Sequence, residues 1–268
     1  GVRIAVLDTG LFEHPWLRGG VQAAPGSADV WDVEAERYGD AEAGHGTFIA
    51  GLIRQVAPSA SVYAVKVLDS HGVGDDLTVA EAIGQLPADV DVINLSLGGY
   101  TDRDAPPLAI ATALRAIDAT DVVVAAAGND GRTRPFWPAA FKQVLAVGAV
   151  EHDRGAWSRA GYSNYGGWVD AVARGSNLES TFAFAETKIA LGTTTGPFDP
   201  LIAFKGWAAW DGTSFATPIA AAMIARTMTR AGLAPAAARD KLIAGAPPAP
   251  APDFPNAVLL DELEGAQS

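Results

Sequence analysis

The 268-residue sequence contains no cysteine, which excludes disulfide bonds, thiolate metal sites and cysteine nucleophiles together. Histidine is scarce as well: the chain has four, so histidine-based chemistry has few candidate positions. No apolar run approaches the roughly 20 residues that a membrane-spanning helix requires, and the first residues lack the sections of a signal peptide. Because a cysteine-free chain is compatible with either redox setting, its localisation stays open.

Basic residues are outnumbered, with 19 Lys and Arg against 31 Asp and Glu and a formal net charge of -12. Nucleic acids are bound through clustered cations, so this balance argues against a nucleic-acid partner. Hydrophobic residues make up 49% of the chain, which is enough for one sizeable core. The chain starts at Gly1 rather than Met, from which we expect a precursor that extends further upstream.

Short apolar runs alternate with helical patterns along most of the chain. Nearly continuous apolar content is typical of parallel strands that are covered on both faces. The predicted strands are Arg3–Leu7, Ser61–Val67, Val90–Leu95, Asp121–Ala126, Val144–Val147 and Trp168–Ala173. The predicted helices are His45–Arg54, Leu77–Leu86, Leu108–Ala119 and Thr213–Ala231, the last with Pro218 near its first turns, where proline is tolerated. This alternation predicts an α/β fold with helices around a mostly parallel central sheet.

Two segments interrupt this alternation of predicted strands and helices. Residues 175–210 are rich in Gly, Thr, Phe and Trp, with Thr193–Thr195 followed by Gly196 and Pro197, which predicts hairpins or a long surface loop. The Ala/Pro-rich stretch from Ala244 to Pro255 predicts that the tail, 245–268, runs extended over the surface. Because no repeat and no clear second domain is visible, we expect residues 1–268 to form a single domain.

Asp8 and His45 stand in settings that suit catalysis, and each has an ordinary alternative. Asp8 ends the first predicted strand, where open α/β sheets place their sites, although an Asp before Thr-Gly also forms turns. His45 lies between glycines at a helix start, where a substrate can approach closely. A plain helix-terminus residue is the alternative for His45.

Ser214 and Asn129 are the other two candidates. Ser214 is expected at the N-terminus of the long helix, where free amides favour developing negative charge, and a simple N-cap is the alternative. Asn129 follows a buried strand, so its side-chain amide is a candidate donor to an oxyanion. A left-handed turn is the alternative for Asn129.

The blocks around these residues resemble the subtilisin-like (subtilase) serine protease family. VLDTG, HGTFIAG and GTSFATP are similar to its Asp, His and Ser blocks, in the chain order Asp8, His45, Ser214. VINLSLGG, VVVAAAGN and VLAVGAV are similar to its connecting strands, and the similarity runs from about residue 2 to 230. The resemblance implies a three-layer αβα fold and a serine endopeptidase. Ser214 would attack, His45 would accept its proton, Asp8 would orient His45, and Asn129 would bind the oxyanion.

The resemblance also implies how a peptide or protein substrate binds. The substrate strand would lie between Gly72-Val73-Gly74 and Ser96-Leu97-Gly98, with main-chain pairing on both sides. Phe136, which precedes Trp137-Pro138, aligns with the floor of the primary specificity pocket. Its bulk predicts a shallow pocket that prefers a small residue at P1, the residue on the acyl side of the scissile bond. A secreted monomer is the default for the family.

We expect the chain to depart from the family by lacking its tight calcium site. Many subtilases place an Asp directly after a His-Pro pair near the catalytic Asp, and an Asn-rich loop after the His helix. Here Trp16 holds the first position, and Arg54-Gln55 lead directly into Val56-Ala57-Pro58. Calcium takes about six to eight oxygen ligands. We therefore expect no calcium there and no cofactor, while weaker sites made of backbone carbonyls elsewhere stay open.

Other functions are disfavoured to different degrees. A pseudoprotease that uses this fold for binding is the first alternative, and the presence of all four candidate residues disfavours it. A nucleotide-binding domain or a phosphatase built on Asp8 is disfavoured because no glycine-rich phosphate loop follows a strand. Among proteases, both a broad degrader and a processing enzyme stay open. The 175–210 insertion, the missing calcium loop and Phe136 favour restricted specificity.

Overall fold

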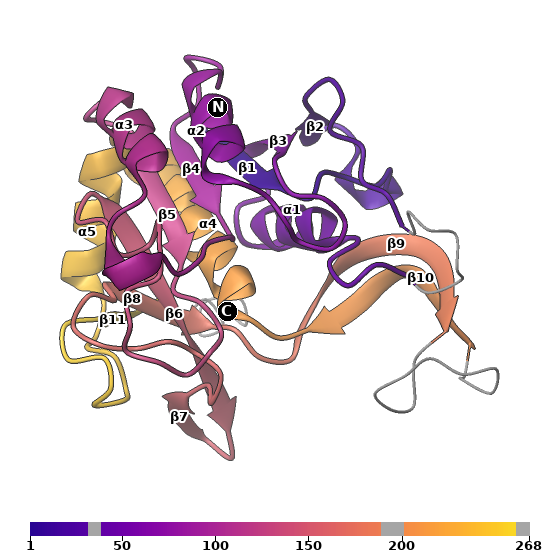
Figure 1. Cartoon of the computed structure of the whole chain (residues 1–268). Coiled ribbons are helices and arrows are strands. Elements are labelled where there is room, and N and C mark those ends of the chain that lie inside the picture. Colours follow the sequence, from indigo (N-terminus) through magenta and orange to yellow (C-terminus); the bar gives the residue numbers. More distant parts are fainter. Residues whose placement is uncertain (32–38, 189–200, 261–268) are drawn as a thin grey trace.

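A parallel sheet forms the centre of the structure, a computed structural model that describes residues 1–31, 39–188 and 201–260 (Figure 1). The strands lie in the order β11-β8-β6-β5-β4-β1-β3-β2, and every neighbouring pair in that order is parallel. A short antiparallel strand, β7, pairs with β6. The bounds are β1 Arg3–Asp8, β2 Val21–Ala23, β3 Ser61–Lys66, β4 Val92–Leu95, β5 Val122–Ala126, β6 Val144–Asp153, β7 Ala156–Arg159, β8 Ala171–Arg174 and β11 Val258–Leu260.

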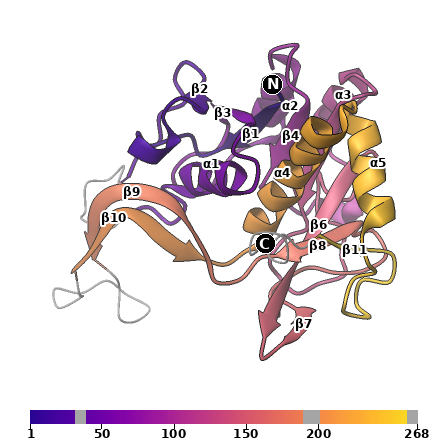
Figure 2. The ribbon, with the colours of Figure 1, turned by 180° about the vertical axis from the view of Figure 1, so that it is seen from behind.

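Helices cover both faces of this sheet. Alternate side chains of β1 point to opposite layers: Ile4 and Val6 belong to the core that includes α1 and α4, whereas Ala5 and Leu7 belong to the core that includes α2 and α3. Figures 1 and 2 show these two helical layers from opposite sides. The α-helices are α1 His45–Val56, α2 Asp76–Gly84, α3 Leu108–Ala116, α4 Thr213–Ala231 and α5 Pro235–Gly245. The predicted three-layer fold is thus confirmed.

Short 3-10 turns, η1 Pro15–Leu17 and η2 Asp102–Asp104, complete the described elements. Among the helices described, none has both the length and the apolar character needed to cross a bilayer. Element ends differ slightly from the predicted ones. The clearest case is α3, which ends at Ala116 rather than Ala119 because Ile117 is extended and the Asp118 side chain accepts a bond from the Thr120 amide.

The chain after α4 returns to the sheet, which differs from a tail that only runs over the surface. Helix α5 starts with Pro235 at its first position, where a missing amide costs nothing. Val258–Leu260 forms β11 and pairs in parallel with β8. Phe254 and Ala257 are buried and anchor the turns that precede this strand. Residues 261–268 of the predicted tail lie outside the described residues.

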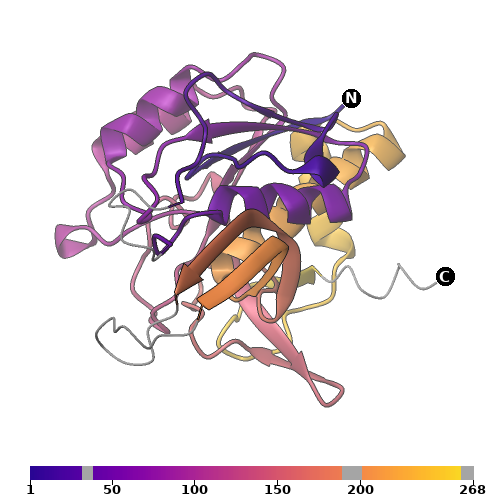
Figure 3. The ribbon, with the colours of Figure 1, turned by 90° about the vertical axis from the view of Figure 1, so that its right-hand side faces the viewer.

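In the region 175–210, strands β9 (Leu178–Lys188) and β10 (Leu201–Trp210) form an antiparallel hairpin, and the predicted turn signals Thr193–Pro197 lie outside the described residues. Figure 3 shows this hairpin beside α1. Two side chains of β9 fasten it to α1: Ser180 Oγ donates to the Phe48 carbonyl at 2.7 Å, and Thr181 Oγ1 donates to the Thr47 carbonyl at 2.8 Å. The hairpin is therefore hydrogen-bonded to the helix that begins with His45.

Candidate active site

A cleft of about 570 Å³ lies at the carboxyl ends of the central strands. This is the edge at which open α/β sheets place their sites. Asp8 lies behind His45 at the end of β1, with 1% of its surface exposed. All the other candidate residues line the cleft together: His45, Gly72, Val73, Gly74, Ser96, Leu97, Gly98, Asn129, Phe136 and Ser214.

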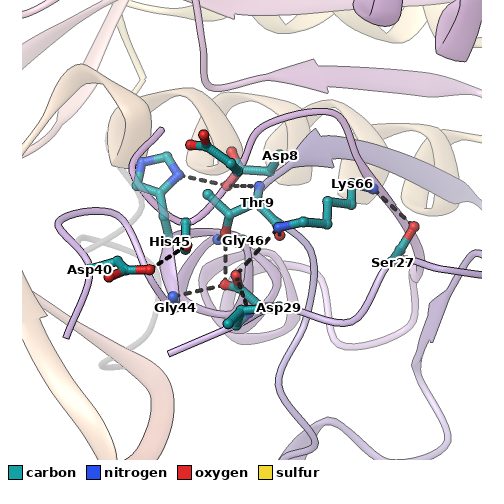
Figure 4. Close-up of polar contacts among 12 residues, drawn as sticks. Asp8, Thr9, Ser27, Asp29, Asp40, Gly44, His45, Gly46 and Lys66 are labelled. Carbon is teal, nitrogen blue, oxygen red and sulfur yellow. Dashed lines mark hydrogen bonds and ion pairs between the residues drawn. The ribbon is translucent and has the colours of Figure 1, made fainter. Parts of the chain in front are cut away.

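Asp8 and His45 form a buried hydrogen-bonded pair (Figure 4). His45 is the first residue of α1, and its Nδ1 lies 2.7 Å from Asp8 Oδ1. The amide of Thr9 donates to the same oxygen at 2.8 Å and fixes the carboxylate. Because the carboxylate oxygen can only accept, the proton of neutral His45 sits on Nδ1, which leaves Nε2 free to accept one. The close approach of α1 to β1 requires glycine at position 46, since a Cβ there would lie 2.3 Å from the Gly10 carbonyl oxygen.

The charge of its neighbours sets the pKa of His45. Burial by itself lowers that pKa, because it disfavours the charged imidazolium. The Asp8 carboxylate opposes this through its charge and its hydrogen bond, and Glu42 and Asp29 add smaller contributions. The net effect raises the pKa of His45 above its ordinary value of 6.5.

Asp29 links the segments next to Asp8 and His45, and no sequence pattern singled it out. Its Oδ2 accepts from Thr9 Oγ1 at 2.9 Å and from the Gly44 amide at 2.8 Å, as Figure 4 shows. The side chain is completely buried. Burial raises the pKa of Asp29, and the bonds from Gly44 and Thr9 oppose that rise. One carboxylate thus holds the residue after Asp8 and the residue before His45 in fixed positions.

Ser214 lies in the first turn of α4, and Gly212 rather than Ser214 is the N-cap of that helix. Its Oγ donates to the Ser96 carbonyl at 3.3 Å, and its own carbonyl accepts from Ser96 Oγ at 2.7 Å. Pro218 explains the second bond and corrects the expectation that it lies among the first-turn amides. A residue at 218 would ordinarily donate its amide to the Ser214 carbonyl, and proline has none. Ser96 supplies the missing donor.

Asn129 lines the cleft with Ser214, and its side-chain oxygen is hydrogen-bonded to Thr213, the residue before Ser214. Its Oδ1 accepts from the Thr213 amide at 2.9 Å and from Thr213 Oγ1 at 2.8 Å, so both donors hold the oxygen on that side. The left-handed conformation falls on Gly128, whose φ is 96°, and not on Asn129. An anion beside Ser214 would therefore meet Asn129 Nδ2 and the Ser214 amide, which belongs to a helix turn whose N–H groups lack intrahelical partners.

Phe136 lies between the two walls of the cleft. A Cβ on Gly98 would lie 2.4 Å from Phe136 Cε1, and one on Gly128 would lie 3.0 Å from its Cδ2. The absence of side chains at these two positions lets the phenyl ring enter the slot. The ring also packs edge-on against Tyr100, with centroids 5.2 Å apart. The slot between the walls is thus already occupied by a side chain of the protein.

Trp210, the last residue of β10, brings the hairpin to the site. Its ring meets the His45 imidazole edge-on at 5.6 Å and Phe48 at 5.9 Å. Phe215 packs against both Trp210 and His45, at 5.2 Å from each. The β9–β10 hairpin therefore borders His45 through the Trp210 side chain.

Comparison with known proteins agrees with this architecture. A sequence model of the Subtilase family matches residues 1–259. The chain is 39% identical over 192 residues to a thermostable alkaline protease of Halalkalibacterium halodurans and 35% identical over 238 residues to M-protease of Shouchella clausii. These alignments cover 68% and 84% of this chain, but 50% and 53% of the two relatives. The chain thus spans about half the length of these curated relatives.

Solved structures of subtilisin-like proteinases are also similar to this chain in fold. A cold-adapted subtilisin-like serine proteinase superposes with a TM-score of 0.71 and 26% identity, covering 98% of this chain and 89% of that one. The prenylagaramide maturation protease PagA superposes with a TM-score of 0.66 and 25% identity, covering 92% and 83%. The fold and the cleft are those of a subtilisin-like α/β protein. The chain belongs to the Subtilase family.

Proposed function

We propose that this chain is a serine endopeptidase domain that acts as a monomer and hydrolyses peptide bonds through an acyl-enzyme on Ser214. The observation that carries the proposal is the buried hydrogen bond of 2.7 Å between Asp8 and His45, at the cleft that also holds Ser214 and Asn129. A buried carboxylate that orients an imidazole beside a serine at a helix N-terminus is the arrangement that serine proteases use.

Each residue then has a defined role. The Ser214 hydroxyl turns from the Ser96 carbonyl toward His45 Nε2, gives up its proton there and forms a C–O bond to the scissile carbonyl carbon. The oxyanion lies between Asn129 Nδ2 and the Ser214 amide. His45 then protonates the leaving amine, the C–N bond breaks and an acyl-enzyme remains. Water attacks this ester with His45 as base, which releases the acid and restores Ser214.

A fluorophosphonate probe tests the proposal directly. We expect one covalent adduct by intact mass on the wild-type protein and none on Ser214→Ala, since only an activated serine hydroxyl reacts. Both proteins are checked for folding by circular dichroism. A folded wild-type protein that stays unlabelled at high probe concentration would contradict the proposal and favour a binding module.

The pH dependence of activity should reflect the environment of His45. A general base works only when it is neutral, so a raised pKa moves the loss of activity to higher pH. We expect kcat/KM to decline on the acid side with a midpoint above 6.5, the ordinary pKa of histidine. The measurement is a kcat/KM profile on one peptide substrate between about pH 5 and 9. A midpoint below 6.5 would show that burial outweighs Asp8.

Specificity at P1 should be set by Phe136. Because its ring occupies the slot between Gly98 and Gly128, we propose that only small P1 residues fit. Replacing Phe136 with glycine should open the slot and raise kcat/KM for P1 Phe or Leu by about 10–100-fold, the usual range for filling a hydrophobic pocket. Paired p-nitroanilide peptides with P1 Ala and P1 Phe measure this. A wild-type enzyme that already prefers P1 Phe would refute the assignment.

A filled P1 slot favours restricted specificity over broad degradation. One structural relative, PagA, is described as a maturation protease, and a processing role of that kind fits a pocket that accepts few side chains. The substrate is then a peptide or protein segment with a small residue before the cleaved bond.

Calcium is not part of this proposal, because the residues at the family position do not suit it. Helix α1 ends at Val56 and β3 begins at Ser61, which leaves no room for a ligand loop. Arg54 Nη1 donates to the carbonyls of Pro58 and Ala60, the latter at 2.7 Å. These two carbonyl oxygens are therefore already hydrogen-bonded to a guanidinium group. In the described part of the chain, no three His, Asp or Glu side chains lie close enough together to hold a metal ion.

Chelation should therefore leave the domain intact. A tight calcium ion at 1,000 times its Kd would add about 4 kcal/mol of stability, which a melting curve detects easily. We expect the Tm in excess EGTA and in millimolar calcium to agree within about 2 °C, less than the effect of 1 kcal/mol. Differential scanning fluorimetry measures it, with a calcium-dependent subtilisin as control. A larger fall in EGTA would reveal a calcium site.

A further inference from the structure

Glu42 places a carboxylate in the cleft beside the catalytic base. Its amide donates to the Ser70 carbonyl at 2.9 Å, and its carbonyl accepts from the His45 amide at 3.0 Å, so its backbone is fixed. Glu42 Oε2 lies 3.9 Å from His45 Nε2. A Cβ on Gly72 would lie 2.7 Å from Glu42 Cγ, which shows that the side chain rests directly on the proposed substrate-binding segment.

The cleft around Glu42 is acidic. Among the described residues that line it, Glu42, Asp75, Asp76 and Asp130 carry carboxylates, and none is Lys or Arg. Two of these acids are already engaged: Asp75 accepts from amides at the start of α2, and Asp130 accepts from the Tyr100 hydroxyl at 2.8 Å. Such an environment attracts cationic peptides and repels acidic ones.

The Glu42 carboxylate, in contrast, receives no hydrogen bond within the part of the chain that the structure describes, and the side chain is 39% exposed and lines the cleft. Burial of its remainder raises the pKa of Glu42, while the nearby His45 opposes that rise. Among the described residues its charged neighbour is His45, at 3.9 Å, and no Lys or Arg lines the cleft beside it. A ligand that brings a cation would therefore stabilise this partly desolvated carboxylate.

The direction in which the substrate chain runs through the cleft determines which of its side chains faces Glu42. Acylation at Ser214 places the P1 residue at the slot occupied by Phe136. In an extended peptide the next side chain, P2, points to the opposite side, which is the side of His45, Gly72 and Glu42.

We propose that Glu42 selects substrates with lysine or arginine at P2. The inference rests on the proposed endopeptidase function and sharpens it, since it defines the substrate as a basic residue followed by a small one at the cleaved bond. The ammonium or guanidinium group of P2 pairs with the Glu42 carboxylate at the mouth of the cleft.

Two peptides that differ by one charge test this. Ala-Ala-Lys-Ala and Ala-Ala-norleucine-Ala p-nitroanilides have P2 side chains of similar length, and only lysine is charged. For the wild-type enzyme at pH 8 we expect kcat/KM to favour lysine by about 10–100-fold, the range of a hydrogen bond between charged groups. For Glu42→Gln the ratio should fall close to one. Because both peptides meet the same base, the ratio cancels any effect of Glu42 on His45.

Asp76→Asn is the matched control, because Asp76 lines the same cleft on α2. Its ratio should stay within about threefold of the wild-type ratio, as expected for an exposed charge screened by solvent. An equal fall in both variants would point to the overall field of the cleft and overturn a local role for Glu42. A wild-type ratio near one, or an unchanged ratio in Glu42→Gln, would overturn it as well.

Binding without turnover separates this inference from the proposed function. Calorimetric titration of the Ser214→Ala protein with the two corresponding peptide amides should show tighter binding of the lysine peptide, and Glu42→Gln in that background should remove the difference. If the fluorophosphonate test fails but this difference is present, the cleft recognises basic peptides without cutting them. If labelling succeeds and both peptides bind equally, the endopeptidase stands and the P2 assignment fails.

Discussion

Replacing Asp8 with asparagine should lower kcat by about 10⁴-fold, the loss that follows the same change in a serine protease triad. Asp8 Oδ1 accepts from both His45 Nδ1 and the Thr9 amide. An NH₂ group at that position cannot accept from either donor, and it would force His45 into the tautomer with its proton on Nε2. The other oxygen, Oδ2, is buried and has no hydrogen-bond partner among the residues that the structure describes, so an NH₂ group there would be an unsatisfied donor.

In either orientation the negative charge that stabilises the imidazolium is lost. The pKa of His45 should fall in this variant, because Asp8 is the main group that raises it. The acid limb of kcat/KM should therefore move to lower pH even as the rate falls. Stopped assays with titrated active sites measure kcat, and the melting temperature confirms a folded protein. A variant within tenfold of the wild-type kcat would show that Asp8 does not orient the base.

Replacing Asn129 with alanine should lower kcat by about 10²–10³-fold, the loss measured at the corresponding donor of subtilisin. The amide is held in place because Thr213 donates twice to Asn129 Oδ1. An oxyanion exists only in the transition state and the tetrahedral intermediate, so KM should change little. Asn129 itself is exposed, but its loss removes the acceptor of the buried Thr213 amide and hydroxyl, so we expect a lower melting temperature but a folded protein.

Thr213→Val is the informative companion to Asn129→Ala. It removes one of the two donors that orient Asn129 but keeps the amide of residue 213. We expect a smaller fall in kcat than for Asn129→Ala. If Asn129→Ala instead raises KM and leaves kcat intact, the side chain binds substrate in its ground state and not the oxyanion.

Local patterns in the sequence singled out the residues on which the proposed mechanism depends. Asp8 ends a continuous apolar run, His45 stands between glycines, and Ser214 lies in the first turn of a long helix, so each position combines a boundary signal with a reactive side chain. The parallel sheet was predictable as well, because strands that are buried on both faces have a nearly continuous apolar composition.

Residues that act through contacts between distant segments left no such pattern. Asp29 bonds to Thr9 and Gly44 only because the chain folds these segments together. Glu42 lies three residues before His45, in the turn that precedes α1, but its contact with Gly72 follows from tertiary packing. The strand β11 was missed because the Ala/Pro-rich stretch before it, from Ala244 to Pro255, also fits an extended surface segment, and the strand itself, Val258–Leu260, is three residues long.

The sheet order has a consequence for when activity first arises. Strand β1, which carries Asp8, lies between β3 and β4, whereas Ser214 belongs to α4, far along the chain. Pairings between segments so distant in sequence form slowly. During synthesis Asp8 and His45 leave the ribosome well before the helix that bears Ser214 exists. Under the proposed mechanism the nascent chain therefore stays inert toward peptides until the segment that carries Ser214 has been translated.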